Sequence, residues 1–339
     1  MRRKTGSSGK PRTKKFSLSL IVLILIFLGL TAYFLGAAKS WDGASRLTVV
    51  VQNISSPPSS VAIPLAIFSI EPKSNQAIFI SIPGNTQVDV PFGYKQFPAS
   101  TVFKLGQLDN KRGGGELLTK STEATFKVAV DRYYVSDGIL PIVALTSGEV
   151  VEIKSSLFSL SGLVSILNLT RGDNSQVYTN LSLVEKLRLW NSIRKLRPDQ
   201  INFINLLETN ILDEERQPDG SLIKIIDKDI LKTVIADNFQ DSAVRLENVT
   251  LEVVNATSEQ RLAGQFSQIL TNMGANVIGK SNSRSKQSGA CLYFLKDKKY
   301  KRNTIIARVA ELYSCKLLEN YIQDSTADIV IILGEDFLK

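Results

Sequence analysis

An uncharged apolar run near the N-terminus constrains this chain more than any other feature. Residues 16–38 contain no charged side chain. At a rise of roughly 1.5 Å per residue, a helix of this length reaches about 30 Å or slightly more, which is enough to cross the hydrocarbon core of a bilayer. The run is apolar on every face, which is untypical of a helix buried in a soluble core. We therefore predict a transmembrane helix over residues 16–38.

The residues before this run indicate its orientation. Residues 1–15 carry seven basic side chains and no acidic one. Positive charge beside a spanning helix favours the cytoplasmic side. We expect a single-pass protein of the cell membrane, with lipid around the helix, a cytoplasmic tail and the bulk of the chain extracytoplasmic. The alternative is a cleaved signal peptide with Ala37-Ala38 at the cleavage site, although the apolar core of such a peptide is usually about 7–15 residues long.

Composition excludes several classes of function. The net charge is +9, but the tail supplies seven of these charges and leaves about +2 for the rest. The basic excess therefore indicates membrane topology, and we predict no nucleic-acid partner. The chain contains no histidine. Ser-His-Asp catalysis, Cys-His catalysis and histidine-bearing zinc sites are excluded with it.

The two cysteines, Cys291 and Cys315, both lie in the part predicted to be extracytoplasmic. Two thiolates alone do not form a structural zinc site. In an oxidising compartment the economical interpretation is a disulfide, which would stabilise the fold by about 2–4 kcal/mol. The alternative is a pair of buried thiols.

Apolar and turn-forming residues alternate regularly through the first part of the chain. The runs ending at Ile70 and Ile82 are apolar at nearly every position and flank the turn-forming residues 71–75. This pattern predicts a hairpin in the centre of a sheet that is covered on both faces. The elements expected here are strands over 46–53, 61–70, 76–82 and 130–137, and a helix over 116–127.

The middle of the chain reads as mostly helical. An apolar stripe from Leu181 to Ile193 predicts one helix, and residues 199–208 are expected to form a second. A turn over 217–220 precedes a short strand over 221–226, and Asp227 is a suitable N-cap for a third helix. Residues 241–248 are expected to be a linker.

A smaller α/β pattern follows this linker. Strands are expected over 249–254, 276–280, 291–295 and 328–333. One helix should follow the first strand, with Thr257 and Gln260 as its capping box and Gly274 at its end. Another helix is expected over 303–313.

Several segments of the first part together resemble a known family. They read FSIEP at 68–72, SIPGNT at 81–86, LGQLDNKRGGGELL at 105–118 and VDRYYVSD at 130–137. In order and spacing they resemble the extracytoplasmic domain of the LytR–CpsA–Psr family. The resemblance implies an α/β/α domain with a central mixed sheet, which we place at residues 46–240.

The last part resembles the LytR C-terminal domain. The similarity rests on the strand ending in Asn255-Ala256-Thr257 and on the segment STADIVIILGEDF at 325–337, although Ala256 stands where the family usually has glycine. The predicted organisation is a tail (1–15), a transmembrane helix (16–38), a LytR–CpsA–Psr-like domain (46–240) and a small α/β domain (248–339).

The resemblance implies a definite reaction. Members of the family transfer a glycopolymer from a polyprenyl-diphosphate carrier to peptidoglycan, with Mg²⁺ and arginines binding the diphosphate. Arginine forks match phosphate oxygens, and carboxylates coordinate Mg²⁺. The family's motif reads SIPRDT, but this chain has Gly84 and Asn85 in place of its arginine and aspartate. The remaining charged candidates are Arg112, Arg171 and Asp173, which we interpret as remnants, so we predict no catalytic, metal-binding or cofactor-binding residues.

Other charged residues admit two interpretations. Arg112 precedes three glycines at a predicted helix start, where phosphate could bind, but a flexible loop explains the same pattern. Asp89, Asp109 and Asp131 could coordinate a metal, but aspartate is also common at turns and strand ends for local reasons.

Three functions follow from these observations. The first is a pseudoenzyme of the cell envelope that binds or organises wall polymer, polyprenyl-phosphate lipid or envelope partners. The alternative is an active, Mg²⁺-dependent glycopolymer phosphotransferase. The third is a transcription regulator, but the cytoplasmic tail is too short to form a DNA-reading domain.

Overall fold

The structure is a computed structural model. It describes residues 22–27, 29, 40–54, 65–136, 148–149, 151–152, 155, 177–319 and 325–338. Within the predicted spanning segment, residues 22–27 are helical and their apolar side chains are exposed. Across the described residues, no helix combines the length and apolarity that membrane crossing requires. Most of the segment 16–38 lies outside these residues, and the transmembrane helix stays a prediction.

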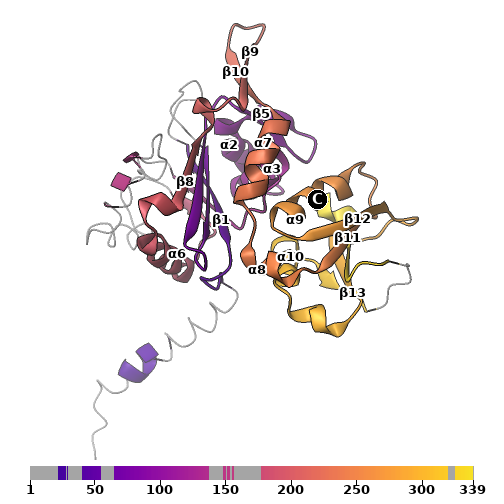
Figure 1. Cartoon of the computed structure of the whole chain (residues 1–339). Coiled ribbons are helices and arrows are strands. Elements are labelled where there is room, and N and C mark those ends of the chain that lie inside the picture. The colour runs from indigo at the N-terminus through magenta and orange to yellow at the C-terminus, as the bar shows by residue number, and fades with distance from the viewer. Residues whose placement is uncertain are drawn as a thin grey trace, which may run out of the picture. The chain divides into compact units, whose positions relative to one another are not determined.

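A mixed sheet organises the first part of the unit that runs from Trp41 onwards (Figure 1). The strands described in it follow the order β7-β6-β1-β2-β3-β8. The central hairpin β2–β3 is antiparallel, whereas β6 runs parallel to β1 and β8 runs parallel to β3. The bounds are β1 Leu47–Asn53, β2 Leu65–Glu71, β3 Gln76–Ile82, β6 Arg132–Ser136, β7 Val177–Thr179 and β8 Ile201–Asn205.

The prediction that β2 and β3 are covered on both faces is confirmed. On one face, side chains such as Ile67 and Ile80 pack against helices α2 (Val102–Leu108), α3 (Gly114–Phe126) and α7 (Lys228–Asn238). The opposite face packs Trp41 and residues of helix α6 (Leu183–Lys195) in a second cluster. Burial on both sides explains why these strands are apolar at almost every position.

The helix predicted over 199–208 is wrong. This segment is strand β8, flanked by two short 3₁₀ turns at Pro198–Gln200 and Leu206–Glu208. The strand pairs in parallel with β3, with Ala77 opposite Ile201. Its sequence INFIN is rich in β-branched and aromatic residues, and pairing satisfies the backbone groups along the edge of β3.

Two short ribbons extend the first part. Strands β4 (Gln87–Val90) and β5 (Lys95–Pro98) form one of them. Strands β9 (Leu212–Arg216) and β10 (Leu222–Ile226) form the other, which projects from the body in Figure 1. The expected turn at 217–220 connects β9 to β10. Strand β9 was missed because its sequence LDEER is mostly charged and exposed.

The second sheet has the strand order β12-β11-β15-β13-β14 within the described residues. The predicted central mixed sheet of the first part and the predicted α/β class of the second are confirmed, and the second sheet is also mixed. Its strands are β11 Thr250–Asn255, β12 Asn276–Asn282, β13 Cys291–Leu295, β14 Lys316–Leu317 and β15 Ile329–Leu333, and its helices are α9 Leu262–Asn272 and α10 Thr304–Tyr313.

Two local predictions fail in this part. The expected linker contains helix α8 (Ser242–Glu247), which begins where the side chain of Asp241 accepts a hydrogen bond from Ala243 N. The expected capping box is absent from α9, because the hydroxyl of Thr257 bonds to Asn255 and Arg261 occupies the N-cap at φ +64° without a side-chain bond. The end of α9 is as predicted, since Gly274 has φ +96°.

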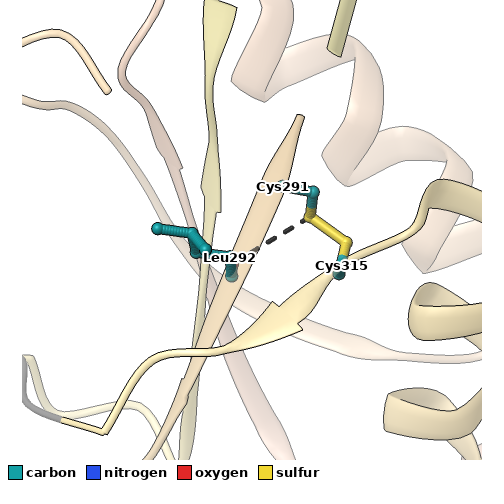
Figure 2. The surroundings of a disulfide bond; sticks show 3 residues. All are labelled: Cys291, Leu292 and Cys315. Atoms are coloured by element: carbon teal, nitrogen blue, oxygen red, sulfur yellow. Dashed lines mark hydrogen bonds between the residues drawn. A yellow bond between two sulfur atoms is a disulfide. The ribbon is translucent and has the colours of Figure 1, made fainter. Parts of the chain in front are cut away.

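The predicted disulfide between Cys291 and Cys315 is confirmed (Figure 2). It joins the first residue of β13 to the residue that precedes β14, and both cysteines are buried. These two strands share only two paired positions. The covalent bond therefore fixes a short edge strand that pairing alone would hold weakly.

We predict that this disulfide stabilises the second part of the chain. The cysteines are 24 residues apart, and a loop of this size corresponds to about 3 kcal/mol. Urea unfolding with and without reductant should show that loss in the wild type. The double variant Cys291→Ala/Cys315→Ala should be weakened similarly and should not respond to reductant. Equal stability of the reduced and oxidised wild type would contradict the prediction.

Candidate functional site

The segment that aligns with the family's SIPRDT motif is a tight turn at the carboxyl end of β3. Thr86 N donates to the carbonyl of Pro83 over 3.1 Å. The backbone carbonyls of Gly84 and Thr86 accept hydrogen bonds from Ser100 N and Ala99 N, respectively. These bonds connect the turn to the 3₁₀ segment Ala99–Thr101, which leads into α2. The two carbonyls are therefore already used in hydrogen bonds within the fold.

The same turn is bonded to the projecting ribbon β9–β10. Asn85 Nδ2 donates to the carbonyl of Leu222 over 3.1 Å, and Lys224 N donates to the carbonyl of Asn85 over 3.2 Å. Thr86 and Lys224 also form an isolated bridge. Asn85 therefore acts as a structural connector between the turn and the ribbon.

Several polar atoms at this end of the sheet have no hydrogen-bond partner among the described residues. They belong to one amide of β1, one hydroxyl of β3, two residues of the turn and one residue of the adjoining 3₁₀ segment. The atoms are Gln52 Oε1, Ser81 Oγ, Asn85 Oδ1, Thr86 Oγ1 and Ser100 Oγ. Since buried polar groups are normally paired, this end of the sheet has unused capacity for hydrogen bonds.

The chemistry of this end is neutral. All five atoms are amide or hydroxyl oxygens. The nearby Lys224 ammonium is paired with Glu214 over 2.6 Å. Across the described residues there is no group of three or more carboxylate, histidine or cysteine side chains that could bind a metal ion. The residues that the structure shows here do not fit Mg²⁺, which prefers carboxylates, and offer no guanidinium for a diphosphate.

Of the other predicted remnants, Arg112 is described, and its printed contacts are with residues outside this turn. Arg112 precedes α3, where it pairs with Asp109 over 3.2 Å and lies 3.8 Å from the ring centroid of Phe92. Arg171 and Asp173 lie outside the described residues. The structure therefore places none of the described remnants with Gly84 and Asn85.

The glycines after Arg112 are explained by packing. A Cβ atom at Gly114 would lie 2.7 Å from the carbonyl oxygen of Phe103, and one at Gly115 would lie 2.2 Å from the ring of Tyr133. The start of α3 therefore needs small residues to approach α2 and β6. An adjacent cavity of about 440 Å³ includes Arg132 and Glu311 in its lining, but both side chains are engaged in ion pairs.

The three aspartates considered as metal ligands have separate structural partners. Asp89 accepts hydrogen bonds from Lys228 and Gln96. Burial alone would raise the pKa of Asp89, but these bonds and the lysine charge lower it below its ordinary value. Asp109 pairs with Arg112, three residues further on, as the local interpretation expects. Asp89 and Asp131 instead bind side chains that are distant in sequence, and Asp131 belongs to the buried pair described next.

The most buried charged pair is Asp131 with Arg308. Their side chains are 2% and 8% exposed, and two guanidinium nitrogens of Arg308 bind the two carboxylate oxygens. Asp131 also accepts a hydrogen bond from Thr48 N over 2.7 Å. Burial alone would lower the pKa of the Arg308 guanidinium, but the charge of Asp131 raises it above its ordinary value. The pair links α10 of the second part to β1 and β6 of the first.

Further polar contacts support this connection. Arg132 binds Glu185 over 2.6 Å and Glu311 over 3.1 Å. Burial of Glu185 would raise its pKa, but hydrogen bonds, above all from Arg132, lower it below the ordinary value. Tyr313 donates to Glu123 over 3.2 Å, and burial together with that carboxylate raises the pKa of the Tyr313 hydroxyl. None of these residues was singled out as a site from the sequence.

The geometry defines first the class of the chain: an α/β protein with two mixed sheets joined by buried ionic contacts. Residues 248–337 match a family model described as the LytR cell envelope-related transcriptional attenuator. This part of the chain is therefore a LytR C-terminal domain. The resemblance of Asn255-Ala256-Thr257 and of residues 325–337 to that domain predicted the same assignment. No curated protein matches the chain in sequence.

Three solved structures of low sequence identity each match more than half of the chain. TagV of Bacillus subtilis has a TM-score of 0.36 at 13% identity, covering 56% of this chain and 94% of its own. TagT of B. subtilis, also solved bound to LIIa-WTA, has a TM-score of 0.36 at 15% identity, covering 57% and 89%. A transcriptional regulator from Enterococcus faecalis, EF0465, has a TM-score of 0.40 at 10% identity, covering 68% and 88%.

We predict that breaking the buried pair is costly because one charge is left unpaired. Arg308→Met should reduce the free energy of unfolding by about 3–5 kcal/mol. Asp131→Asn/Arg308→Met should recover much of this loss, since it removes both charges and keeps the acceptor for Thr48. Chemical denaturation followed by circular dichroism measures both.

The matched control is Arg197→Met. Arg197 pairs with Asp199 over 3.0 Å, and the two side chains are 70% and 66% exposed. Its removal should cost less than about 1 kcal/mol. Similar losses for Arg308→Met and Arg197→Met would contradict the importance of the buried pair.

Proposed function

We propose that this chain is a membrane-anchored protein of the cell envelope whose LytR–CpsA–Psr-like domain has lost phosphotransfer. In this proposal it binds or organises wall polymer or envelope partners. The LytR C-terminal domain at residues 248–337 supports the assignment to the envelope. The ordered resemblance of FSIEP, SIPGNT and VDRYYVSD to the family supports the same assignment for the first part.

The observation that carries the non-catalytic part of the proposal is the neutral turn at Gly84 and Asn85. A diphosphate carries at least two negative charges, and its transfer depends on cations that neutralise the developing charge. Asn85 instead donates to the backbone of Leu222, and the lysine beside it is paired with Glu214. The described residues at this turn therefore include no guanidinium that could neutralise a diphosphate, which supports the non-catalytic part of the proposal.

Loss of phosphotransfer predicts a clear result in an activity assay. The full chain, incubated with Mg²⁺, peptidoglycan and a polyprenyl-diphosphate-linked glycan, should release no lipid phosphate above background and attach no glycan. The variant Gly84→Arg/Asn85→Asp restores the two charged residues of the family's motif and tests whether they alone suffice. Robust transfer by the wild type, lost in Arg112→Ala or Arg171→Ala, would overturn the proposal.

The anchored topology is a separate prediction. The seven basic residues before Phe16 favour a cytoplasmic N-terminus and an extracytoplasmic C-terminus. A tag placed after Lys339 should be cleaved when protease is added to intact spheroplasts, whereas a tag before Met1 should be cleaved only after lysis. Recovery of the chain in the soluble fraction, with residues 1–38 removed, would favour the signal peptide instead.

A further inference from the structure

A wide polar groove lies at the opposite end of the first sheet from the turn at 83–86. It has a volume of about 840 Å³ and is formed by the β2–β3 turn, the start of β8, the end of α7 and the start of α8. Its volume is within the range of sites that enclose small molecules. Six amide side chains line it: Asn75, Gln76, Gln200, Asn202, Asn238 and Gln240.

Several of these amides are fixed by internal hydrogen bonds that use only one end of the side chain. Gln200 Oε1 accepts from Arg197 N over 2.8 Å. Asn202 Nδ2 donates to Asn238 Oδ1 over 2.8 Å, and Gln240 Nε2 donates to the carbonyl of Ala236 over 2.9 Å. Among the described residues, this leaves Gln200 Nε2 as a donor and the oxygens of Asn202 and Gln240 as acceptors.

This arrangement presents oriented donors and acceptors together. A hydroxyl group is one donor and two acceptors, so neighbouring hydroxyls are matched by a lining that contains both kinds of group. Because internal bonds already hold the amides, less conformational freedom is lost when a ligand binds. Bound water can occupy the same positions until it is displaced.

The charges of the groove are balanced. Arg46 and Glu71 are buried and bonded to each other over 3.3 Å. Asp199 pairs with Arg197 over 3.0 Å, and the exposed Arg245 supplies the second positive charge of the lining. Among the described residues, the lining therefore carries two positive and two negative side chains, which does not favour a polyanion.

Three apolar residues of two strands complete the described lining. Ala77 and Ile78 of β3 and Ile201 of β8 contribute to the lining. Because Ala77 and Ile78 are only 5% and 2% exposed, the groups that this lining presents to a ligand are mainly polar. The combination of fixed, at least partly exposed amides and balanced charge distinguishes this groove from the turn at the other end of the sheet, whose unpaired oxygens are buried.

We propose that this groove binds a net-uncharged, polyhydroxylated glycan. The inference rests on the proposed function only for the source of the glycan, which would be the cell wall. The groove is separate from the segment at 81–86, where the family resemblance places the reaction. Its ligand would be recognised by hydrogen bonds to hydroxyl and amide groups, with no contribution from metal or phosphate.

The test is calorimetric titration of the full chain, in a detergent without a sugar headgroup, with the hexamer of N-acetylglucosamine. The wild type should bind the hexamer, and Gln76→Ala/Asn202→Ala should bind it about tenfold more weakly, since two neutral hydrogen bonds are lost. Both side chains are exposed, so the variant should keep the wild-type melting temperature. Asn210→Ala, an exposed amide outside the groove, should bind as the wild type does.

Charge is tested with hexagalacturonate, which has similar length and hydroxyl content but a carboxylate on each ring. It should bind at least tenfold more weakly than the neutral hexamer. Equal or tighter binding would overturn the inference, as would failure of the wild type to bind the neutral hexamer. Unchanged affinity in Gln76→Ala/Asn202→Ala would exclude the groove as the site.

Two further measurements are needed. One distinguishes a wall glycan from a lipid headgroup, and the other distinguishes failure of this inference from failure of the proposed function. The affinity for the hexamer is measured with the full chain in lipid nanodiscs, with and without a diglucosyl lipid, and should be the same in both. Loss of binding only in the discs that contain the glycolipid would assign the groove to a lipid headgroup and overturn the wall-glycan inference. Sedimentation with insoluble peptidoglycan should fall in the double variant. Equal sedimentation of wild type and variant would overturn the inference while leaving wall binding intact.

Discussion

The buried ion pair between Asp131 and Arg308 is the interaction on which the rest of the structure depends. Asp131 lies just before β6 and also accepts the amide of Thr48 in β1, so one carboxylate connects two strands of the first sheet to helix α10. Two buried charges are expensive to desolvate, and either one alone would be a large penalty. The pair therefore makes the LytR C-terminal domain and the first sheet mutually dependent, and it explains why their contact is ionic as well as apolar.

This use of charge bears directly on function. Arg46, Arg112 and Arg132 each bind a carboxylate of the same chain, as Arg308 does. A guanidinium that binds a carboxylate has fewer N–H donors left for a diphosphate. In the described part of the first sheet and its helices, these arginines form ion pairs within the chain. The turn at Gly84 carries only neutral groups. The neutral turn and the paired arginines both agree with the proposal that this chain does not transfer phosphate.

The sequence predicted local features well and long-range ones poorly. The β2–β3 hairpin, α3 and the strands of the last domain follow from apolar patterns and turn residues within a few positions. Strand β8 was mistaken for a helix because its identity depends on pairing with β3, more than a hundred residues earlier. Arg308 offered one local signal, since it interrupts the buried side of TIIARVAELY between Ile306 and Val309. Its partner, 177 residues away, could not be read from that signal.

The two ends of the first sheet differ in the hydrogen-bonding groups that a ligand can reach. At the carboxyl end of β3, backbone bonds from the 3₁₀ segment and from β10 close the turn, and the unpaired oxygens beside it are buried. At the other end, the amides are fixed by their own bonds but still face an open groove. A lining of this kind can recognise hydroxyl groups by hydrogen bonding alone, which needs neither a metal nor a cation. The proposed glycan site therefore lies at the end of the sheet where described amides line an open groove, and not at the turn whose backbone is bonded to its neighbours.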